Sequence, residues 1–161
     1  MSSMGSNAKE HRDGLLQLVT FSVDGEEFGI EILIVKEIIR FMESTKVPNA
    51  PEFVEGVINL RGQIIPVIDM RKRFGLASAT RDQHTRIIVV EIQSLRAGFI
   101  VDAVSEVLRI PAGTVEPAPP MVAGIDSEFI RGVGKLDDRL LILLDLERLF
   151  SDMEKRQLAG V

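Results

Sequence analysis

Short stretches of alternating apolar and polar residues run through most of the chain and predict β-strands. Residues 15–23 place apolar side chains at nearly every second position, and the dipeptide Asp24-Gly25, a strong hairpin signal, follows them. Residues 27–41 are rich in β-branched side chains and predict one or two strands, although their charges also permit a short helix. Residues 86–92 predict a buried strand, and residues 97–111 predict a strand pair that ends at a proline. The pattern is typical of a mostly β protein.

The two ends of the chain depart from this pattern. Residues 145–160 carry apolar side chains at helical spacing and predict an amphipathic C-terminal helix, whose apolar face comprises Leu146, Leu149, Phe150 and Met153. Residues 1–14 are polar and lack the apolar core of a signal peptide, so we expect a disordered tail. No apolar run approaches the roughly 20 residues of a membrane span.

An internal repeat organises the rest of the sequence. Residues 53–74 align without a gap with residues 129–150, at an offset of 76, and six of these positions are identical. Upstream, residues 35–40 match residues 104–109 at an offset of 69, which also pairs Gly29 with Gly98. Because strand composition alone does not reproduce the order of glycine, aspartate and phenylalanine, we interpret the chain as a duplication of one small β unit.

Two small units of short strands have exposed edges, which such sheets commonly remove by curling into barrels. We therefore expect two β-barrels in which the segments 53–74 and 129–150 superpose. Pro66 lies inside an apolar strand and cannot donate a ladder hydrogen bond, so this strand should be an edge at that point or carry a bulge. The matching position in the second half is Ile142, which has no such restriction.

Composition excludes several classes of function. The chain has 161 residues, 45% of them hydrophobic, and a net charge of −5, which argues against a nucleic-acid-binding protein. Its aromatic residues are all phenylalanine, so the tyrosine and tryptophan grooves that hold proline-rich peptides are missing. The absence of cysteine suits the cytoplasm. Neither His11 nor His84 has a serine or cysteine partner by motif, and no metal-ligand spacing occurs, so we expect no enzyme, metal or cofactor.

The turn at Asn59-Leu60-Arg61-Gly62 interrupts two apolar runs and places an arginine beside a glycine. If the matched positions are neighbours in the fold, Glu37 can pair with Arg61, and we expect this pair to be partly buried. The second half would then set Glu106 against Asp137, two like charges. The alternative is an ordinary solvated turn, in which Gly62 supplies backbone freedom.

Two further groups of charged residues have alternative readings. Asp69 and Asp145 recur at matched positions after a strand, which suggests N-caps of short helical turns; paired catalytic carboxylates are the alternative. The basic run 71–73 is expected to be a solvated face, with binding to an acidic partner as the alternative.

The segment GVINLRGQIIPVIDMRKRFG resembles the signature of the chemotaxis coupling protein family CheW. The resemblance continues through FSVDGEEFGIEILIVKEIIR, AGFIVDAVSEVLRIP and DDRLLILLDLERLF, and it covers residues 15–153 as one CheW-like domain. It implies two small five-stranded SH3- or OB-like β-barrels in a pseudo-symmetric pair, with a C-terminal helix. It also implies a non-enzymatic, cytoplasmic adaptor that joins chemoreceptors to the histidine kinase CheA in arrays at the inner membrane, without inserting into the membrane or binding nucleic acid.

The same resemblance assigns candidate binding residues. The receptor-binding region would comprise Val35, Glu37, Gly56, Asn59, Arg61 and Gly62. The kinase-contact loop would span 116–121 and include Glu116, Pro117 and Met121. This loop departs from the acidic-aromatic ending usual in the family, because Pro120-Met121 stand there.

Two other functions stay open at the level of sequence. One is a tandem β-barrel module that binds peptides or nucleic acids and shares only the scaffold; a filter-binding assay with mixed RNA and DNA distinguishes it. The other is a CheW-like domain that belongs to a larger signalling protein.

Overall fold

The computed structural model describes residues 14–122, 124–149 and 151–159. Most of the tail predicted for residues 1–14 therefore lies outside the described residues, as do Phe150 and Gly160 of the predicted helix. Within the described part of the chain, no helix is long and apolar enough to cross a membrane.

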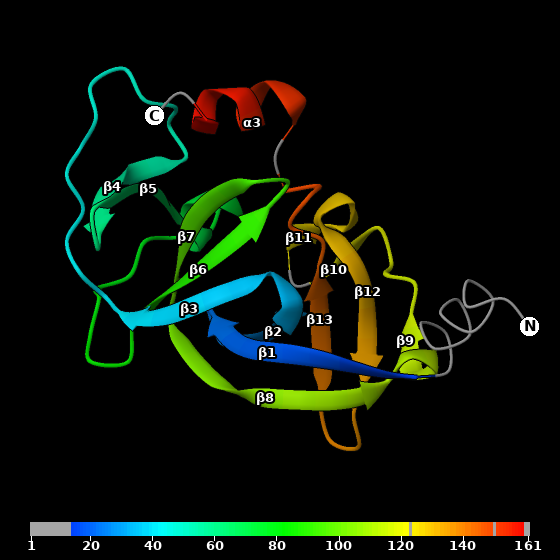
Figure 1. The fold of residues 1–161 in the computed structure, drawn as a ribbon. Helices are drawn as coiled ribbons and strands as arrows, with labels where there is room; N and C mark the ends of the chain where they lie inside the picture. Colours follow the sequence, from blue (N-terminus) through cyan, green and yellow to red (C-terminus); the bar gives the residue numbers. More distant parts are fainter. Residues whose placement is uncertain (1–13, 123, 150, 160–161) are drawn as a thin grey trace, which may run out of the picture.

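Most of the described residues form two antiparallel-rich sheets, one on each side of Figure 1. The first sheet has the strand order β8-β1-β2-β13-β12-β9, and the second has the order β3-β6-β7-β5-β4. The strands of the first sheet are β1 (Leu15–Val23), β2 (Glu26–Glu31), β8 (Ala103–Pro111), β9 (Val115–Glu116), β12 (Ile130–Lys135) and β13 (Leu140–Leu144). Those of the second sheet are β3 (Val35–Arg40), β4 (Val54–Leu60), β5 (Gln63–Asp69), β6 (Arg86–Ile92) and β7 (Leu95–Val101).

Short elements complete the fold. The region predicted as one or two strands over 27–41 forms β2 and β3, joined by a 3-10 turn. The remaining elements are η1 (Ile32–Ile34), α2 (Met70–Arg73), η2 (Ala112–Thr114), β10 (Met121–Val122), β11 (Ile125–Asp126), η3 (Ser127–Phe129) and α3 (Asp152–Ala159). The described residues are thus mostly β with a small C-terminal helix.

The two sequence repeats exchange strands between the sheets. The hairpin β1–β2 of the first repeat joins β8, β12 and β13 of the second repeat, while β6–β7 of the second repeat joins β3, β4 and β5 of the first. The exchange means that neither sheet is built from one half of the sequence alone. Each repeat needs the other to complete its sheet.

The strand registers match between the repeats, irregularities included. Lys36 is skipped in the pairing of β3 with β6, and Ser105, its match at the offset of 69, is skipped in the pairing of β8 with β1. Glu55 and Arg131, which correspond at the offset of 76, are skipped in the same way in the β4–β5 and β12–β13 hairpins. Because bulges at identical positions follow from backbone geometry and not from composition, they support the duplication independently of residue identity.

The two sheets curl, but the strand pairing of the described residues leaves both orders open, so the closed barrels expected from the sequence are not found. The closest approach to closure in the second sheet is an isolated bridge between Thr45, beyond the end of β3, and Val57 of β4. Its counterpart in the first sheet is the pairing of β9 with β12, which makes that sheet six-stranded instead of five-stranded.

Glycine makes both edge contacts possible. A Cβ atom at Gly56 would lie 2.5 Å from Ser44 Oγ and 2.6 Å from the Thr45 carbonyl oxygen. At Gly132, the matched position, it would lie 2.5 Å from Val115 Cγ1. A side chain at either position would push the approaching edge away.

Three hydrophobic clusters stabilise this arrangement. The largest lies between the sheets and includes Phe21, Phe28 and Phe99. A smaller cluster lies within each curled sheet: one around Val67 and Ile87, the other around Leu18 and Leu143. Residues of the two smaller clusters correspond through the repeat, so each sheet has a core of its own in addition to the shared one.

Pro66 lies where the sequence predicts that one side of its strand is unpaired. It pairs with Val57 of β4, while the parallel pairing of β5 with β7 begins only at Val67. In the second half, Ile142 pairs with Phe28 of β2, a contact that proline would not support. The parallel ladder of the second sheet therefore begins one position later than that of the first sheet.

The C-terminal helix is shorter than predicted. Helix α3 spans Asp152–Ala159 in place of 145–160, and residues 145–149 form hydrogen-bonded turns. Its start is fixed by a capping box: Ser151 Oγ accepts from Glu154 N at 3.1 Å, and the Glu154 carboxylate accepts from Ser151 N at 2.9 Å. Leu146 and Leu149 of the predicted apolar face are buried in the central core, while Phe150 and the side chain of Met153 lie outside the described part.

Candidate functional site

The turn between β4 and β5 has the tight geometry that its sequence suggests. Leu60 pairs with Gln63, so Arg61 and Gly62 are the two central residues of the hairpin. Both have positive φ angles, 51° and 85°, which is the type I′ pattern. The Asn59 side chain accepts a hydrogen bond from Gly62 N at 2.8 Å. The turn is therefore fixed from within and holds Arg61 in one backbone conformation.

The guanidinium of Arg61 forms the predicted ion pair with Glu37 of β3. Arg61 Nη1 donates to Glu37 Oε1 at 2.7 Å, and Nη2 donates to Oε2, which makes the pair bidentate. The arginine side chain is 70% exposed and the glutamate 27%, so the pair lies on the surface instead of being partly buried as a unit. The hydrogen bond from Arg61 lowers the pKa of Glu37 and raises that of Arg61, so both stay charged over a wide pH range.

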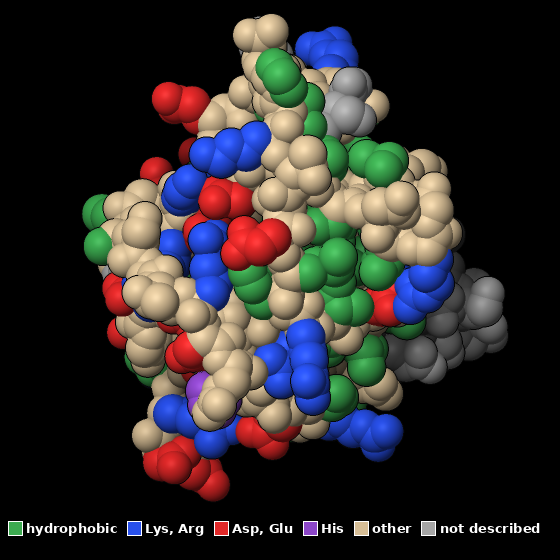
Figure 2. All heavy atoms as spheres, turned by 90° about the vertical axis from the view of Figure 1, so that its left-hand side faces the viewer, with side chains coloured by type: hydrophobic (Ala, Val, Ile, Leu, Met, Phe, Trp, Pro, Cys, Tyr) green, Lys and Arg blue, Asp and Glu red, His purple; other side chains and the backbone are tan. Residues whose placement is uncertain are grey.

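This ion pair joins the two outer strands of the second sheet, since Glu37 lies on β3 and Arg61 follows β4. Figure 2 views the molecule from the side on which β4 and β5 lie, and shows hydrophobic side chains gathered beside charged groups of both signs. Such a mixture of an apolar area with a charged border is typical of protein-binding surfaces.

The six predicted receptor-binding residues do not form one exposed patch. Glu37, Asn59, Arg61 and Gly62 meet at the turn. Gly56 is buried in its strand and admits the backbone of residues 44–45, while Val35 packs against the central core. The bulge at Lys36 separates Val35 from Glu37. Gly56 and Val35 therefore shape the sheet from which the turn projects.

In the second half of the chain, the structure corrects the contact that the sequence predicts between Glu106 and Asp137. Glu106 accepts instead from Arg139 Nη2 at 3.1 Å, and Arg139 Nε also lies 2.8 Å from Glu27 Oε1. Arg139 stands two positions after Asp137 in the β12–β13 turn, so it replaces the missing arginine from the far side of the turn. Both sheets thus carry an arginine–glutamate pair between a hairpin turn and the opposite edge strand.

Exposed apolar side chains accompany both pairs, and these were not predicted. Ile38 lies next to Glu37 and Ile64 follows the Arg61 turn; their matches in the second half are Val107 and Leu140. Only Ile38 had a signal in the sequence, because it lies out of phase with the alternation of β3, whereas Ile64 and Leu140 begin continuous apolar runs.

The predicted kinase-contact loop lies at the edge of the first sheet. Glu116 belongs to β9, pairs with Val133 of β12, and its carboxylate is 3.3 Å from Lys135 Nζ. Pro117 is exposed, and Met121 at the start of β10 is 61% exposed. This loop and the Arg61 turn therefore belong to different sheets.

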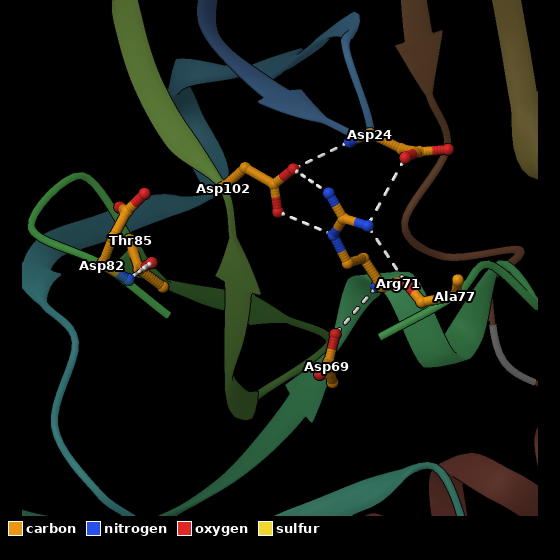
Figure 3. Close-up of polar contacts among 7 residues, drawn as sticks. All are labelled: Asp24, Asp69, Arg71, Ala77, Asp82, Thr85 and Asp102. Atoms are coloured by element: carbon orange, nitrogen blue, oxygen red, sulfur yellow. Dashed lines mark hydrogen bonds and ion pairs between the residues drawn. The ribbon is translucent and has the colours of Figure 1, made fainter. Parts of the chain in front are cut away.

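The basic run 71–73 is not the solvated face expected from the sequence. Arg71 lies between two carboxylates (Figure 3): Nε donates to Asp102 Oδ1 at 3.0 Å, Nη2 donates to Asp102 Oδ2 at 2.6 Å, and Nη1 lies 3.4 Å from Asp24 Oδ1. Lys72 pairs with Glu55 at 2.7 Å. Arg73 donates to the Leu149 carbonyl and pairs with Glu154 at 3.2 Å. All three cations hold parts of the chain together.

Asp69 caps α2, as predicted, by accepting from Arg71 N at 2.9 Å, and Asp145 accepts from Glu147 N at 3.1 Å. Asp69 also accepts from Arg81 at 3.0 Å. His84 is exposed in a loop. Among the described residues, no group of three or more histidine, aspartate or glutamate side chains is arranged to hold a metal ion.

Comparisons with known proteins agree with this reading. The family model "CheW-like domain" matches residues 17–154. The chain is 39% identical to the chemotaxis protein CheW of Klebsiella aerogenes over 138 residues, which cover 86% of this chain and 83% of that protein. It is 36% identical to the Treponema pallidum protein of the same name over 153 residues, covering 92% and 90%.

A solved structure is similar over most of the chain. The crystal structure of the scaffolding protein TtCheW from Thermoanaerobacter tengcongensis matches with a TM-score of 0.78 at 45% identity, covering 86% of this chain and 90% of that one. These relatives are named as chemotaxis and scaffolding proteins, not as catalysts. The chain belongs to the CheW-like domain family, a non-catalytic scaffold family of bacterial chemotaxis.

Proposed function

We propose that this chain is an adaptor that couples the cytoplasmic tips of transmembrane chemoreceptors to the regulatory domain of the histidine kinase CheA. It would act in the cytoplasm, within receptor arrays at the inner membrane. The support is membership of the CheW-like family, together with two separate exposed surfaces on different sheets.

The receptor surface is centred on Arg61. The observation that carries this assignment is the exposed guanidinium, held by a fixed turn and a bidentate bond to Glu37. A preoriented arginine loses little conformational freedom when it binds, which favours its use in recognition. Ile38 on β3 and Ile64 on β5 supply exposed apolar area in the same sheet.

The kinase surface is the edge of the first sheet at residues 116–121. Met121 offers a flexible apolar side chain in the open, and Glu116 with Lys135 supplies charges at its border. We further propose that each curled sheet acts as one SH3- or OB-like barrel unit, because the Thr45–Val57 bridge and the β9–β12 pair draw the outer edges together. The kinase domain would then meet a barrel end.

Two substitutions test this division by titration calorimetry of the full chain with a receptor cytoplasmic fragment and, separately, with the kinase regulatory domain. Arg61→Ala should weaken receptor binding at least tenfold and leave kinase binding unchanged. Met121→Glu should weaken kinase binding by about 2 kcal/mol, the loss typical of an interface anchor, and leave receptor binding unchanged.

Each substitution has a matched control. Arg139→Ala removes the equivalent arginine of the second half and should leave receptor binding unchanged. Leu15→Glu introduces the same charge at a side chain as exposed as Met121, 61% in both cases, and should leave kinase binding unchanged. Equal losses from Arg61→Ala and Arg139→Ala, or from Met121→Glu and Leu15→Glu, would contradict the assignment.

A further inference from the structure

Helix α3 covers an apolar pocket that the adaptor role does not explain. The pocket has a volume of about 190 Å³ and lies between α3 and the strands β6 and β7. Apolar side chains form most of its wall: Val90, Leu95, Ala97, Phe99, Leu146 and Leu158. Lys155 and Arg156 of α3 also line it and reach solvent, so they stand at its mouth.

The repeat explains why there is empty space at this place. In the first repeat, Phe21 pairs with Phe28 across β1 and β2, and their rings stack with centroids 5.7 Å apart. At the offset of 69, the same cross-strand pair in β6 and β7 is Val90 with Ala97. Two phenyl groups of one repeat are thus replaced by an isopropyl and a methyl group in the other. The pocket is the space that this replacement opens.

The size and lining of the pocket define the apolar part of a ligand. A protein cavity of about 150 Å³ lined by aliphatic and aromatic side chains stays dry and binds benzene. A pocket of about 190 Å³ therefore has room for one aromatic ring with a short substituent. An aromatic ring is also the group that the first repeat places at the matching position, through Phe28.

The mouth of the pocket defines the polar part of the ligand. Neither Lys155 nor Arg156 forms an ion pair with a carboxylate whose side chain the structure describes, although most arginines of the described residues are paired with a carboxylate or a carbonyl group. The chain as a whole is acidic, so two cations beside an apolar pocket are a local departure from its charge. They favour an anionic substituent that extends from the pocket toward solvent.

We propose that the pocket under α3 is a binding site for a small carboxylic acid that carries a single aromatic ring. The ring occupies the space beside Ala97, and the carboxylate meets Lys155 and Arg156. The adaptor would then respond to a soluble metabolite at a site separate from the Arg61 turn and from the 116–121 loop.

The test uses 3-phenylpropionate and its uncharged analogue 3-phenylpropanol as probes of the full chain, with amide chemical shifts followed by NMR. The acid should bind with a dissociation constant at least fivefold lower than that of the alcohol, and the shifts should concentrate on β6, β7 and α3. Ala97→Leu fills the pocket and should weaken both probes at least tenfold. The double substitution Lys155→Gln and Arg156→Gln should remove the preference for the acid while the alcohol binds as before.

Two comparisons keep the result decisive. Arg109→Ala removes an exposed cation of β8, outside the pocket, and should change neither affinity. Thermal unfolding of each variant checks that it is folded; if Ala97→Leu fails this check, Val90→Phe takes its place. Absence of shifts at the pocket, or binding of the acid that Ala97→Leu leaves intact, would overturn the proposal. Equal affinity of acid and alcohol would overturn the role of the two cations.

Discussion

At the scale of single residues, the Arg61 turn combines three separate tasks. Asn59 closes the turn through a side-chain hydrogen bond, Gly62 adopts the left-handed backbone conformation, and Arg61 adopts it as well while extending its side chain to Glu37. Left-handed conformations are unfavourable for residues with a Cβ atom, so Arg61 stores strain that a glycine would avoid. The chain thus carries an arginine in a backbone conformation that a glycine would adopt without strain.

The left-handed backbone at Gly62 should make a methyl group unfavourable there. Since its φ is 85°, Gly62→Ala should lower the free energy of unfolding by about 1–2 kcal/mol. Urea denaturation followed by circular dichroism measures the loss. Gly62→Asn is the control, because asparagine tolerates this conformation and should lose clearly less. Alanine and asparagine variants of equal stability would show that the turn does not impose the left-handed backbone.

Asp102 shows how a single carboxylate can stabilise the contact between elements. Its burial would raise its pKa, but hydrogen bonds from Arg71 and from Asp24 N, together with the charge of Arg71, hold the pKa below the ordinary value of 3.8. The carboxylate is therefore ionised in the folded chain at pH values where it is partly protonated in the unfolded chain. Its contribution to stability is complete above pH 3.8 and is lost as the pH falls through the lower pKa of the folded state.

This linkage predicts a difference in acid sensitivity. The free energy of unfolding of the unmodified chain should fall more steeply below pH 3.8 than that of Asp102→Asn, which has no proton to gain at this position. A series of urea titrations from neutral to acidic pH compares the two slopes. The pKa values of Glu55 and Glu91 are also lowered, but their effects are common to both proteins and cancel. Parallel curves would mean that the Arg71–Asp102 contact does not stabilise the folded state.

At the scale of elements, the duplication is visible in the backbone as well as in the sequence. Matched strands carry matched bulges, and each sheet brings its outer edges together at a glycine. The exchange of the β1–β2 and β6–β7 hairpins ties the repeats together, because the first sheet is incomplete without β1–β2 of the first repeat and the second sheet is incomplete without β6–β7 of the second repeat. The repeats are therefore parts of one cooperative unit.

Edge closure can be tested at Gly56. Gly56→Ala places a methyl group against Ser44 Oγ and the Thr45 carbonyl, so the Thr45–Val57 bridge should open. Forced overpacking of this kind typically costs about 1–3 kcal/mol. Hydrogen exchange of the Thr45 and Val57 amides, which bond to each other's carbonyls at 2.8 Å, should accelerate. Unchanged protection of both amides would show that the edge has room for a side chain.

Local patterns in the sequence predicted the strands, the repeat and the Glu37–Arg61 contact, whereas contacts between distant segments were harder to predict. The hairpin exchange has no local signal, because β1–β2 and β6–β7 find their partner strands in the other repeat, far away in the sequence. Arg139 was missed because an ungapped alignment matches Arg61 to Asp137, and the compensating arginine stands two positions later.

The start of α3 was predictable from Ser151 and Glu154, whose spacing is that of a capping box. The basic run was misread because its carboxylate partners are distant in sequence.

At the scale of the whole molecule, the two surfaces proposed for receptor and kinase belong to different sheets. The Arg61 turn projects from the second sheet, and the 116–121 loop borders the first. The central core fixes the sheets against each other, so neither surface needs to rearrange when the other is occupied. In the proposed function, the chain would hold receptor and kinase at a constant separation.

The most direct test of this account is whether both partners bind at once. A receptor cytoplasmic fragment is titrated by calorimetry into the chain alone and into the chain saturated with the kinase regulatory domain. Separate surfaces predict dissociation constants for the receptor fragment that agree within about twofold, and sedimentation should show a ternary complex. A receptor affinity that falls in proportion to the concentration of kinase domain would mean that the partners compete for one surface, and it would contradict the assignment of an adaptor with two binding faces.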